Sequence, residues 1–271
     1  MALDLDGTLL DANGLLPAGT AAILRTLSDI GVRIVLASGR MTARVLPYAR
    51  QLGIPLGLVT YNGAEILEGG PDSWNAVSTR GISSATRDAV FTLCRAQGVF
   101  LNVYAAGQLY GYHPDGDFTW SRHYETNSGA VYAGKHASLD DLPREDIAKL
   151  LVIGDVGKRE RLFEAWSPLL SGHCALTKSN PEYLEFLASG VSKGSSLEIW
   201  LERKAIDHRE LLAFGDAEND LEMLRLAGLG IAMANATPGL RAVYRRVSRW
   251  THEEEGVARE LTALFGLAPA P

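Results

Sequence analysis

Short runs of apolar residues alternate along much of the chain with segments in which apolar residues recur at helical spacing. The run Val32–Ser38 is short and rich in branched aliphatic residues, which is typical of a buried strand. The segment Pro17–Ile30 is periodic at helical spacing, with a proline at its start and Gly31 directly after its end. This alternation predicts an α/β fold with a parallel sheet.

The first and last thirds of the chain follow this alternation. We expect a turn at Asn62-Gly63 between two strands, and a disturbance at Pro47 within a helix. Strands are predicted at 2–5 and 32–38, on both sides of the turn within 56–67, at 210–216 and at 229–236. Helices are predicted at 17–30, 41–53, 192–206, 218–228, 237–247 and 255–266. The last five residues, 267–271, are expected to fray.

The middle third has a different pattern. A helix is predicted at 84–98 and a hairpin at 99–113, where polar and apolar residues alternate around a turn that contains glycine. Further strands are expected at 148–154 and 182–188, around a helix near 159–170. We therefore predict a core domain formed by 1–79 and 181–271, with a separate α+β domain, 80–180, inserted into it.

Composition narrows the class of protein. The chain has 271 residues, of which 46% are hydrophobic and 21% charged, as in an ordinary globular protein. Its net charge of −6 argues against nucleic acid as a partner, and no apolar run is long enough to span a membrane. The amino terminus lacks the basic segment of a signal peptide. The chain has only two cysteines, Cys94 and Cys174, and no C-x-x-C motif, which favours a reducing, cytoplasmic location.

Two acidic residues, Asp4 and Asp6, stand at the carboxyl end of the first predicted strand. Side chains two positions apart in a strand point to the same face, and ligands bind at this edge of open α/β sheets. Two carboxylates held together repel each other unless a cation lies between them or one takes a proton. A metal site, or a nucleophile with an acid–base partner, would offset this cost. The alternative is a plain turn at Asp6-Gly7-Thr8.

Other strand ends carry polar residues as well. Ser38 follows a buried strand, and a hydroxyl with backbone N–H groups at such a junction suits an oxyanion or a phosphate; a plain helix cap is the alternative. Asp216 ends another strand, and Asn219 and Asp220 follow it, which is the hard-oxygen composition that Mg²⁺ prefers. Lys193 stands at the start of a helix, where a lysine is favourable only beside negative charge; otherwise it is a surface residue.

These segments together resemble a known family. The stretches "DLDGT", "SGR", "SKG" and "GDAEND", in this order, resemble the four motifs of the haloacid dehalogenase superfamily of phosphohydrolases. The length of the segment between the second and third motifs resembles the Cof-type subfamily, which has a type IIB α+β cap. The closing "THEEEGVARELTALFG" is similar to the ending of that subfamily, so the resemblance covers essentially the whole chain.

The resemblance implies a Rossmann-like catalytic core, a cap that selects the substrate, and a role for each motif residue. Asp4 would be the nucleophile that forms an aspartyl-phosphate, and Asp6 the general acid and base. Ser38 would bind the transferring phosphoryl group, and Lys193 would offset its charge. The residues that would hold Mg²⁺ are Asp4, Asp6 through its backbone carbonyl, Asp216 and Asp220. The residues expected to bind phosphate or substrate are Thr8, Gly39, Arg40, Asn62 and Asn219.

The function predicted from this resemblance is a Mg²⁺-dependent phosphatase of small phosphorylated metabolites, with sugar phosphates as the leading class. The alternatives are a phosphomannomutase-like phosphotransferase and a non-catalytic small-molecule-binding protein of the same fold. We expect a monomer or a weak homodimer. In the cap, the candidates for substrate contacts are Tyr104, His113, Arg122, His123, Lys135 and Lys178, whereas His252 is expected to be a surface residue.

The first strand is unusually short, since only three residues precede Asp4. We expect that a few apolar residues added in front of Met1 raise the melting temperature.

Overall fold

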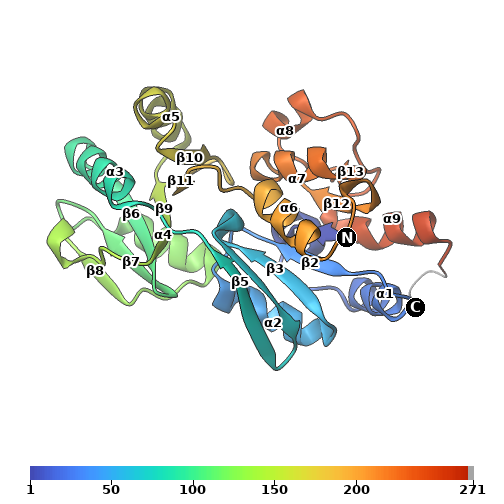
Figure 1. Cartoon of the computed structure of the whole chain (residues 1–271). Coiled ribbons are helices and arrows are strands. Elements are labelled where there is room, and N and C mark those ends of the chain that lie inside the picture. The colour runs from blue at the N-terminus through green and yellow to red at the C-terminus, as the bar shows by residue number, and fades with distance from the viewer. Residues whose placement is uncertain (268–271) are drawn as a thin grey trace. The chain divides into compact units, whose positions relative to one another are not determined.

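The structure is a computed structural model that describes residues 1–267, so most of the segment predicted to fray lies outside the described residues. It divides into two compact units: Met1–Thr79 together with the chain from Ser192 onward, and the inserted unit Arg80–Val191. The second boundary lies eleven residues beyond the predicted one (180 against 191), because the strand β11 (Tyr183–Ala188) pairs with β9 (Ile147–Ile153) in the inserted unit. Figure 1 shows the course of the chain.

The first unit contains a seven-stranded sheet with the strand order β13-β12-β1-β2-β3-β4-β5. Its five parallel strands are β1 (Ala2–Leu3), β2 (Ile34–Ala37), β3 (Leu56–Thr60), β12 (Leu212–Gly215) and β13 (Leu229–Ala232). The antiparallel pair β4 (Glu65–Gly70) and β5 (Ser73–Thr79) extends the sheet beyond β3. The parallel order brings the carboxyl ends of β1, β2 and β12 to one edge of the sheet, where a ligand site is expected.

Alternate residues of these strands pack on opposite faces of the sheet. Leu3 and Leu36 belong to a core covered by α1 (Ala18–Asp29), α2 (Thr42–Leu52) and α9 (Gly256–Phe265). Ala2 and Val35 belong to a second core, covered by α6 (Lys193–Arg203), α7 (Leu221–Leu226) and α8 (Pro238–Val243). Both faces of the parallel strands are therefore buried, which explains why these strands are continuous apolar runs in the sequence.

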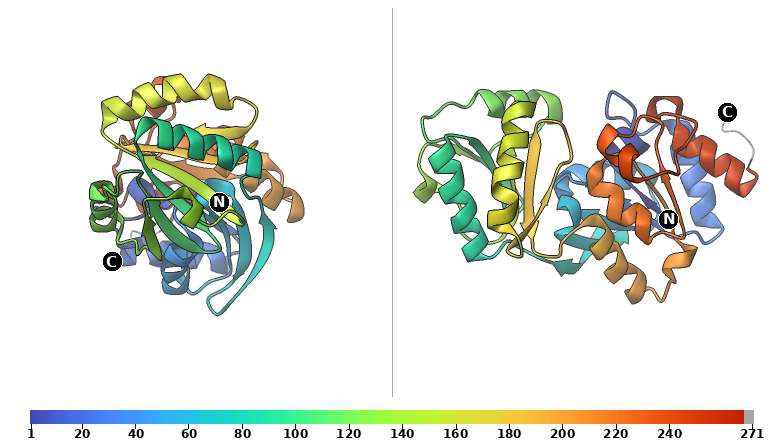
Figure 2. Two further views of the ribbon diagram at one scale, coloured as in Figure 1. Left: turned by 90° about the vertical axis from the view of Figure 1, so that its left-hand side faces the viewer. Right: turned by 90° about the horizontal axis from the view of Figure 1, so that it is seen from above.

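The inserted unit is an α+β layer with its own core. Its six-stranded sheet has the order β10-β11-β9-β6-β7-β8 and is antiparallel except where β7 pairs with β8. The helices α3 (Ser84–Gln97) and α5 (Val156–Leu170) cross the same face of this sheet (Figure 2) and pack there through residues such as Val90 and Trp166. The remaining strands are β6 (Phe100–Ala105), β7 (Gln108–Tyr112), β8 (Gly134–His136) and β10 (Cys174–Thr177).

The strands β5, β8 and β10 were not predicted, and two helices also differ from the expectations. The helix α2 continues through Pro47, because Val45 before the proline and Ala49 and Leu52 after it are all buried on the core. The helix α4 (Thr119–Ser128) was not predicted, since Ser121 is its only buried residue and its sequence has no apolar stripe.

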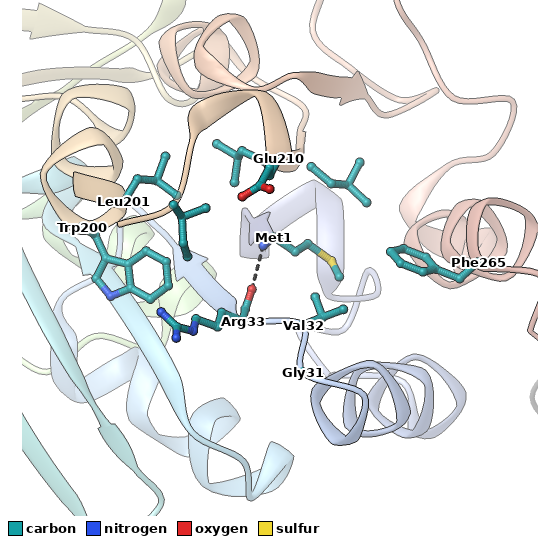
Figure 3. A pocket seen from close by; sticks show the side chains of 11 residues that line it. Met1, Gly31, Val32, Arg33, Trp200, Leu201, Glu210 and Phe265 are labelled. Carbon is teal, nitrogen blue, oxygen red and sulfur yellow. Dashed lines mark hydrogen bonds between the residues drawn. The ribbon is translucent and has the colours of Figure 1, made fainter. Parts of the chain in front are cut away.

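A pocket of about 360 Å³ lies at the amino-terminal edge of the core sheet, where the strands β2 and β12 begin. Figure 3 shows the side chains that line it. The α-amino group of Met1 faces it and donates a hydrogen bond of 2.7 Å to the carbonyl oxygen of Arg33. Burial lowers the pKa of this amino group to about 5. The pocket is lined mainly by apolar side chains, among them Val32, Leu211 and Leu212.

Within residues 1–267, no helix combines the length and the apolar character that crossing a membrane requires.

Candidate active site

The first motif forms a tight turn directly after β1. The backbone N–H of Asp4 still bonds to the carbonyl oxygen of Phe214 in β12, at 3.1 Å, but the paired strand ends at Leu3. Gly7 then adopts a left-handed conformation with φ of 75°, and a Cβ at this position would lie 2.4 Å from Oδ2 of Asp216. The turn therefore requires glycine, both for its backbone conformation and for its close approach to a carboxylate.

This turn separates the two acids that the sequence places on one strand face. Asp4 is buried, with 4% of its surface exposed, whereas the Asp6 side chain is 58% exposed. The expectation that both point the same way along a strand is wrong, because the strand ends before either residue. The two carboxylates have different environments, which suits different chemical roles.

Lys193 connects two buried carboxylates. Its Nζ lies 2.6 Å from Oδ1 of Asp4 and 2.6 Å from Oδ1 of Asp220, and the side chain is almost completely buried. Ser192 caps the first turn of α6 and so fixes the point from which the lysine extends. Burial alone would lower the pKa of Lys193, but the charges of Asp220 and then Asp4 outweigh it and raise that pKa above its usual value. The lysine therefore carries a positive charge beside Asp4.

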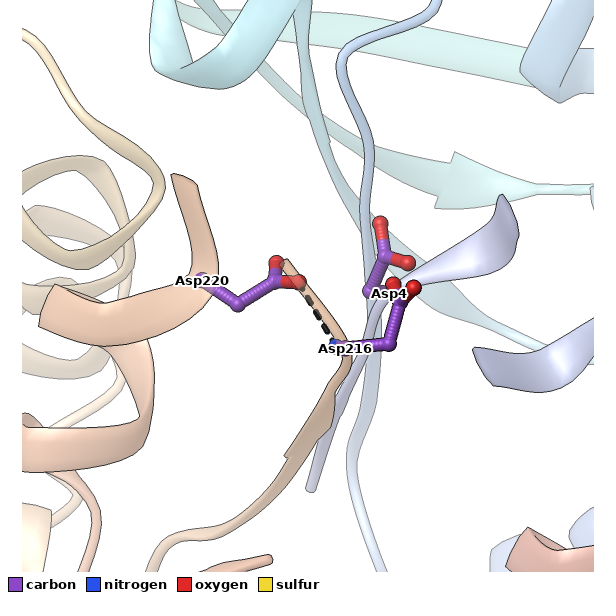
Figure 4. A group of neighbouring side chains, drawn as sticks. All are labelled: Asp4, Asp216 and Asp220. Carbon is purple, nitrogen blue, oxygen red and sulfur yellow. Dashed lines mark hydrogen bonds between the residues drawn. The ribbon is translucent and has the colours of Figure 1, made fainter. Parts of the chain in front are cut away.

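Asp220 organises the loop that follows β12. Its Oδ2 accepts hydrogen bonds from the backbone N–H groups of Asp216, at 2.9 Å, and Ala217, at 3.1 Å. Both oxygens of Asp220 are therefore engaged within the protein. The carboxylate of Asp216 remains free to face Asp4, and its Oδ1 accepts a long hydrogen bond of 3.4 Å from the hydroxyl of Thr8. Figure 4 shows the Asp4 and Asp216 carboxylates next to each other.

The site has the composition of a divalent-cation site. Asp4, Asp216 and Asp220 each offer a carboxylate oxygen within 4.8 Å of the others. Burial, followed by the repulsion of neighbouring carboxylates, raises the pKa of Asp216 to about 9. Burial also raises the pKa of Asp4 to about 7, although Lys193 opposes this shift. Lys193 offsets only one of the three charges, so a hard cation with an oxygen preference would fit here.

The second motif joins the carboxyl ends of β2 and β3. Ser38 is fully buried, and its Oγ accepts a hydrogen bond of 3.1 Å from the backbone N–H of Arg40. The Ser38 carbonyl oxygen accepts one of 3.0 Å from the N–H of Asn62. Gly39 lies against the Asn62 side chain, since a Cβ there would be 3.0 Å from Oδ1 of Asn62. Nδ2 of Asn219 donates to the same Oδ1 at 2.9 Å, which links this loop to the loop after β12.

The turn after β3 is strained in a way that positions Asn62. Tyr61, Asn62 and Gly63 have successive positive φ values of 49°, 55° and 109°. Such conformations are unfavourable for residues with a side chain and persist where the surroundings hold them. A Cβ at Gly63 would lie 2.3 Å from the carbonyl oxygen of Ser192, so the turn packs directly against the start of α6. The turn at Asn62-Gly63 therefore does more than join two strands, because it also packs against α6.

Arg40 lies at the other side of the site. The sequence predicts that it binds phosphate or substrate, but its guanidinium group forms a two-pronged ion pair with Asp6 and a hydrogen bond to the hydroxyl of Tyr48.

The structure thus gathers nearly all the predicted site residues of the core at one sheet edge. The site also contains Asn235, which was not predicted from the sequence. Nδ2 of Asn235 donates to the carbonyl oxygen of Gly7 at 2.8 Å, and Oδ1 of Asn235 accepts from the N–H of His252 at 3.0 Å. His252, expected at the surface, is half-buried in this arrangement. Asn235 follows β13, so the rule that polar residues at strand ends mark the site could have found it.

Comparison with known proteins identifies the class. The family model of haloacid dehalogenase-like hydrolases matches residues 1–261, so the chain belongs to this family, as its motifs predict. A 5-amino-6-(5-phospho-D-ribitylamino)uracil phosphatase of Bacillus subtilis is 28% identical over 276 aligned positions, 98% of this chain and 97% of the relative. An HMP-PP phosphatase of Citrobacter koseri is 29% identical and covers 96% of this chain and 93% of the relative.

A solved structure extends the agreement to the architecture. The subclass IIB sugar phosphatase BT4131, of the same superfamily, superposes with a TM-score of 0.80 at 19% identity. It covers 98% of each chain. The predicted fold, a Rossmann-like core with an α+β cap of type IIB, is confirmed. The chain is a phosphatase of this family.

Proposed function

We propose that the chain is a Mg²⁺-dependent phosphatase of small phosphorylated metabolites that works through an aspartyl-phosphate on Asp4. The observation that carries this proposal is the buried Asp4 carboxylate, which contacts Lys193 and has Asp216 beside it. A carboxylate in this position is shielded from water and held by a positive charge, as a nucleophile toward an anionic phosphoryl group must be.

The reaction proceeds in two displacements. An oxygen of Asp4 attacks phosphorus, the bond from phosphorus to the leaving oxygen breaks, and Asp6 gives that oxygen a proton. A water molecule then attacks the phosphorus of the aspartyl-phosphate and gives a proton to Asp6, and the bond to Asp4 breaks. Inorganic phosphate leaves, and Asp4 and Asp6 return to their starting forms.

The neighbouring groups stabilise charge on the phosphoryl oxygens. Lys193 supplies a fixed positive charge, and the Ser38 hydroxyl and the backbone N–H of Gly39 supply donors at the end of β2. Asn62 and Asn219, joined by their side-chain hydrogen bond, hold the opposite side of the site. Thr8 follows Gly7, and its hydroxyl donates to Oδ1 of Asp216. Each of these groups is fixed before substrate binds, so little reorganisation is needed in the transition state.

Mg²⁺ would be held by the carboxylates of Asp4 and Asp216 and by the backbone carbonyl of Asp6, with Asp220 orienting the loop that carries Asp216. Oδ1 of Asn219 is buried and has no hydrogen-bond partner in the described part of the chain, which leaves an oxygen acceptor for the cation or its water. When bound, Mg²⁺ would act as a Lewis acid on a phosphoryl oxygen and offset the repulsion between the carboxylates.

The names of the relatives support the proposed substrate class. The named relatives act on phosphorylated metabolites, and sugar phosphates are the leading class for this chain. The inserted unit is proposed to select the substrate. We further propose a cytoplasmic location, consistent with two buried free cysteines, Cys94 and Cys174, and a monomeric or weakly dimeric state.

Phosphate release from a panel of phosphorylated metabolites tests this function. We expect release with Mg²⁺ and none with a chelator, loss of release in Asp4→Asn, and normal release in Asp72→Asn, which changes an exposed acid in the turn between β4 and β5. A folded wild-type protein that releases no phosphate across the panel would refute the proposal. Transfer primed by a sugar bisphosphate, with little free phosphate, would favour a phosphotransferase instead.

A further inference from the structure

The Asp6 carboxylate is exposed, yet both of its oxygens are engaged. Nε of Arg40 donates to Oδ2 at 2.7 Å, and Nη2 donates to Oδ1 at 2.5 Å. A two-pronged pair of this kind fixes the plane of a carboxylate as well as its position, which a lysine cannot do. An exposed aspartate on a turn would otherwise sample several rotamers.

Arg40 is itself held from three directions. Its backbone N–H bonds to Oγ of Ser38, and its Nη1 donates to the hydroxyl of Tyr48 at 2.9 Å. The guanidinium carbon also lies 5.4 Å from the centre of the Tyr48 ring, within range of a cation–π interaction. The Tyr48 hydroxyl in turn donates to the carbonyl oxygen of Gly14 at 2.8 Å. The arginine is therefore part of a rigid support that ends on Asp6.

The Arg40 side chain has only hydrogen-bond donors, so both oxygens of Asp6 act as acceptors in this pair. In the proposed cycle Asp6 is ionised at one stage: after it has given its proton to the leaving group and before it takes one from water. The aspartyl-phosphate exists at this stage. The Arg40 pair therefore holds Asp6 in a fixed position as an acceptor, which is the role that it has toward the attacking water.

We propose that Arg40, supported by Tyr48, is a positioning residue that holds Asp6 as the base for hydrolysis of the aspartyl-phosphate. This proposal rests on the proposed function and assigns Arg40 to the second displacement. In this role Arg40 does not contact the phosphoryl group of the substrate, although the resemblance to the family had implied that it would. Arg40 acts on the water only through Asp6, which accepts the proton.

The two displacements can be separated with p-nitrophenyl phosphate. Its leaving group departs without a proton, so formation of the aspartyl-phosphate needs no acid, whereas its hydrolysis still needs the base. The value of kcat/KM reports formation, and the decay of the phosphoenzyme after unlabelled substrate is added reports hydrolysis.

The experiment compares the wild type with Arg40→Gln, Tyr48→Phe and Arg50→Gln, the last of which changes an exposed arginine in the final turn of the same helix. General bases contribute about 10²–10⁴-fold, so a misplaced base should slow phosphoenzyme decay by about tenfold or more in Arg40→Gln. We expect a smaller slowing in Tyr48→Phe, none in Arg50→Gln, and kcat/KM for p-nitrophenyl phosphate within about threefold of the wild type throughout.

Three results would overturn the proposal. A fall in kcat/KM in Arg40→Gln with unchanged decay would assign Arg40 to the phosphoryl group. Equal losses in both steps with a lowered melting temperature in Arg40→Gln, and no change in Tyr48→Phe, would make the arginine merely structural. Phosphate release without any phosphoenzyme in the wild type would refute the proposed mechanism itself, and the role of Arg40 with it.

Discussion

At the scale of single residues, the site depends on which carboxylates are contacted by positive charge or by hydrogen-bond donors. The single charge of Lys193 is shared between Asp4 and Asp220, and the backbone N–H groups of the loop after β12 also donate to Asp220. Asp4 and Asp216 lie at the ends of two adjacent parallel strands, where burial and then the charge of Asp4 raise the pKa of Asp216. Because Gly7 has no Cβ, the Asp216 carboxylate can lie close to the turn after β1.

Two glycines have the same backbone conformation but different surroundings, so alanine variants of them distinguish backbone strain from steric contact. Gly7 and Gly14 have φ of 75° and 72°, but a Cβ at Gly14 would meet nothing nearer than 3.9 Å. A left-handed residue with a Cβ costs about 1–2 kcal/mol, so both alanine variants should lose roughly this much stability. Only Gly7→Ala displaces Asp216, and we expect it alone to lose about 100-fold in kcat/KM, since active-site misplacement of about 1 Å costs this much. Phosphatase assays and urea unfolding of both variants test this; comparable activity in the two would contradict it.

At the scale of elements, the site is assembled from the ends of β1, β2, β3 and β12 and the start of α6. The sequence predicts these elements because each buried strand is a continuous apolar run and each helix on the core has an apolar stripe. The same logic missed α4, which has no such stripe. It predicted the strand β11 correctly, but an apolar run does not show to which sheet a strand belongs. Pairing between distant strands, such as β11 with β9, is not encoded in local periodicity.

The short first strand leads to a prediction about stability. The pocket at Met1 is bordered by Val32 and Arg33 ahead of β2 and by Leu211 ahead of β12, which flank the line that β1 would follow if it were extended. Burying one aliphatic side chain there is worth about 1.5–3 kcal/mol before ordering costs. A Leu-Ile pair inserted between Met1 and Ala2 should therefore raise the melting temperature by a few degrees, whereas a Ser-Gly pair should not. Equal melting temperatures for the two variants would show that the pocket does not accept strand residues.

At the scale of the whole molecule, the four motifs and their order predict the family and the two-unit organisation, but not every contact within the site. The pairing of Arg40 with Asp6 and the support from Tyr48 and Asn235 depend on the turn after β1 and on neighbouring loops. A local residue pattern does not predict such contacts, since the partners are far apart in the sequence. The strand-end rule predicts which segments meet, and the loops determine which atoms do.

The stability of the molecule should depend on pH and on the metal together. The pKa of Asp4, about 7, and that of Asp216, about 9, lie above the values of unfolded aspartates, about 3.9. At these two groups the folded state binds more protons than the unfolded state, so their contribution to stability is fully present below about pH 4 and is lost as the pH rises to about 9. The lowered pKa of the Met1 amino group, about 5, opposes this loss in part. In chelator, the melting temperature should therefore fall over this window, and Mg²⁺ should restore most of it at the upper end.

A single variant checks the origin of this effect. Asp216→Asn removes one charge, so it should raise the melting temperature in chelator at pH 8 and abolish the response to Mg²⁺. Thermal unfolding across pH values with and without Mg²⁺ measures both. A wild-type melting temperature that rises with pH in chelator, or a variant that still responds to Mg²⁺, would contradict the assignment.

The proposed function requires that Asp4 carries the phosphoryl group, and trapping the intermediate shows whether it does. The wild-type protein is mixed with Mg²⁺ and a substrate from the panel, quenched in acid and treated with borohydride, which reduces an aspartyl-phosphate to homoserine. Peptide mass spectrometry then locates the modified residue. We expect homoserine at position 4 in the wild type and none in Asp4→Asn. Modification of another residue, or turnover with position 4 unmodified at every quench time, would contradict it.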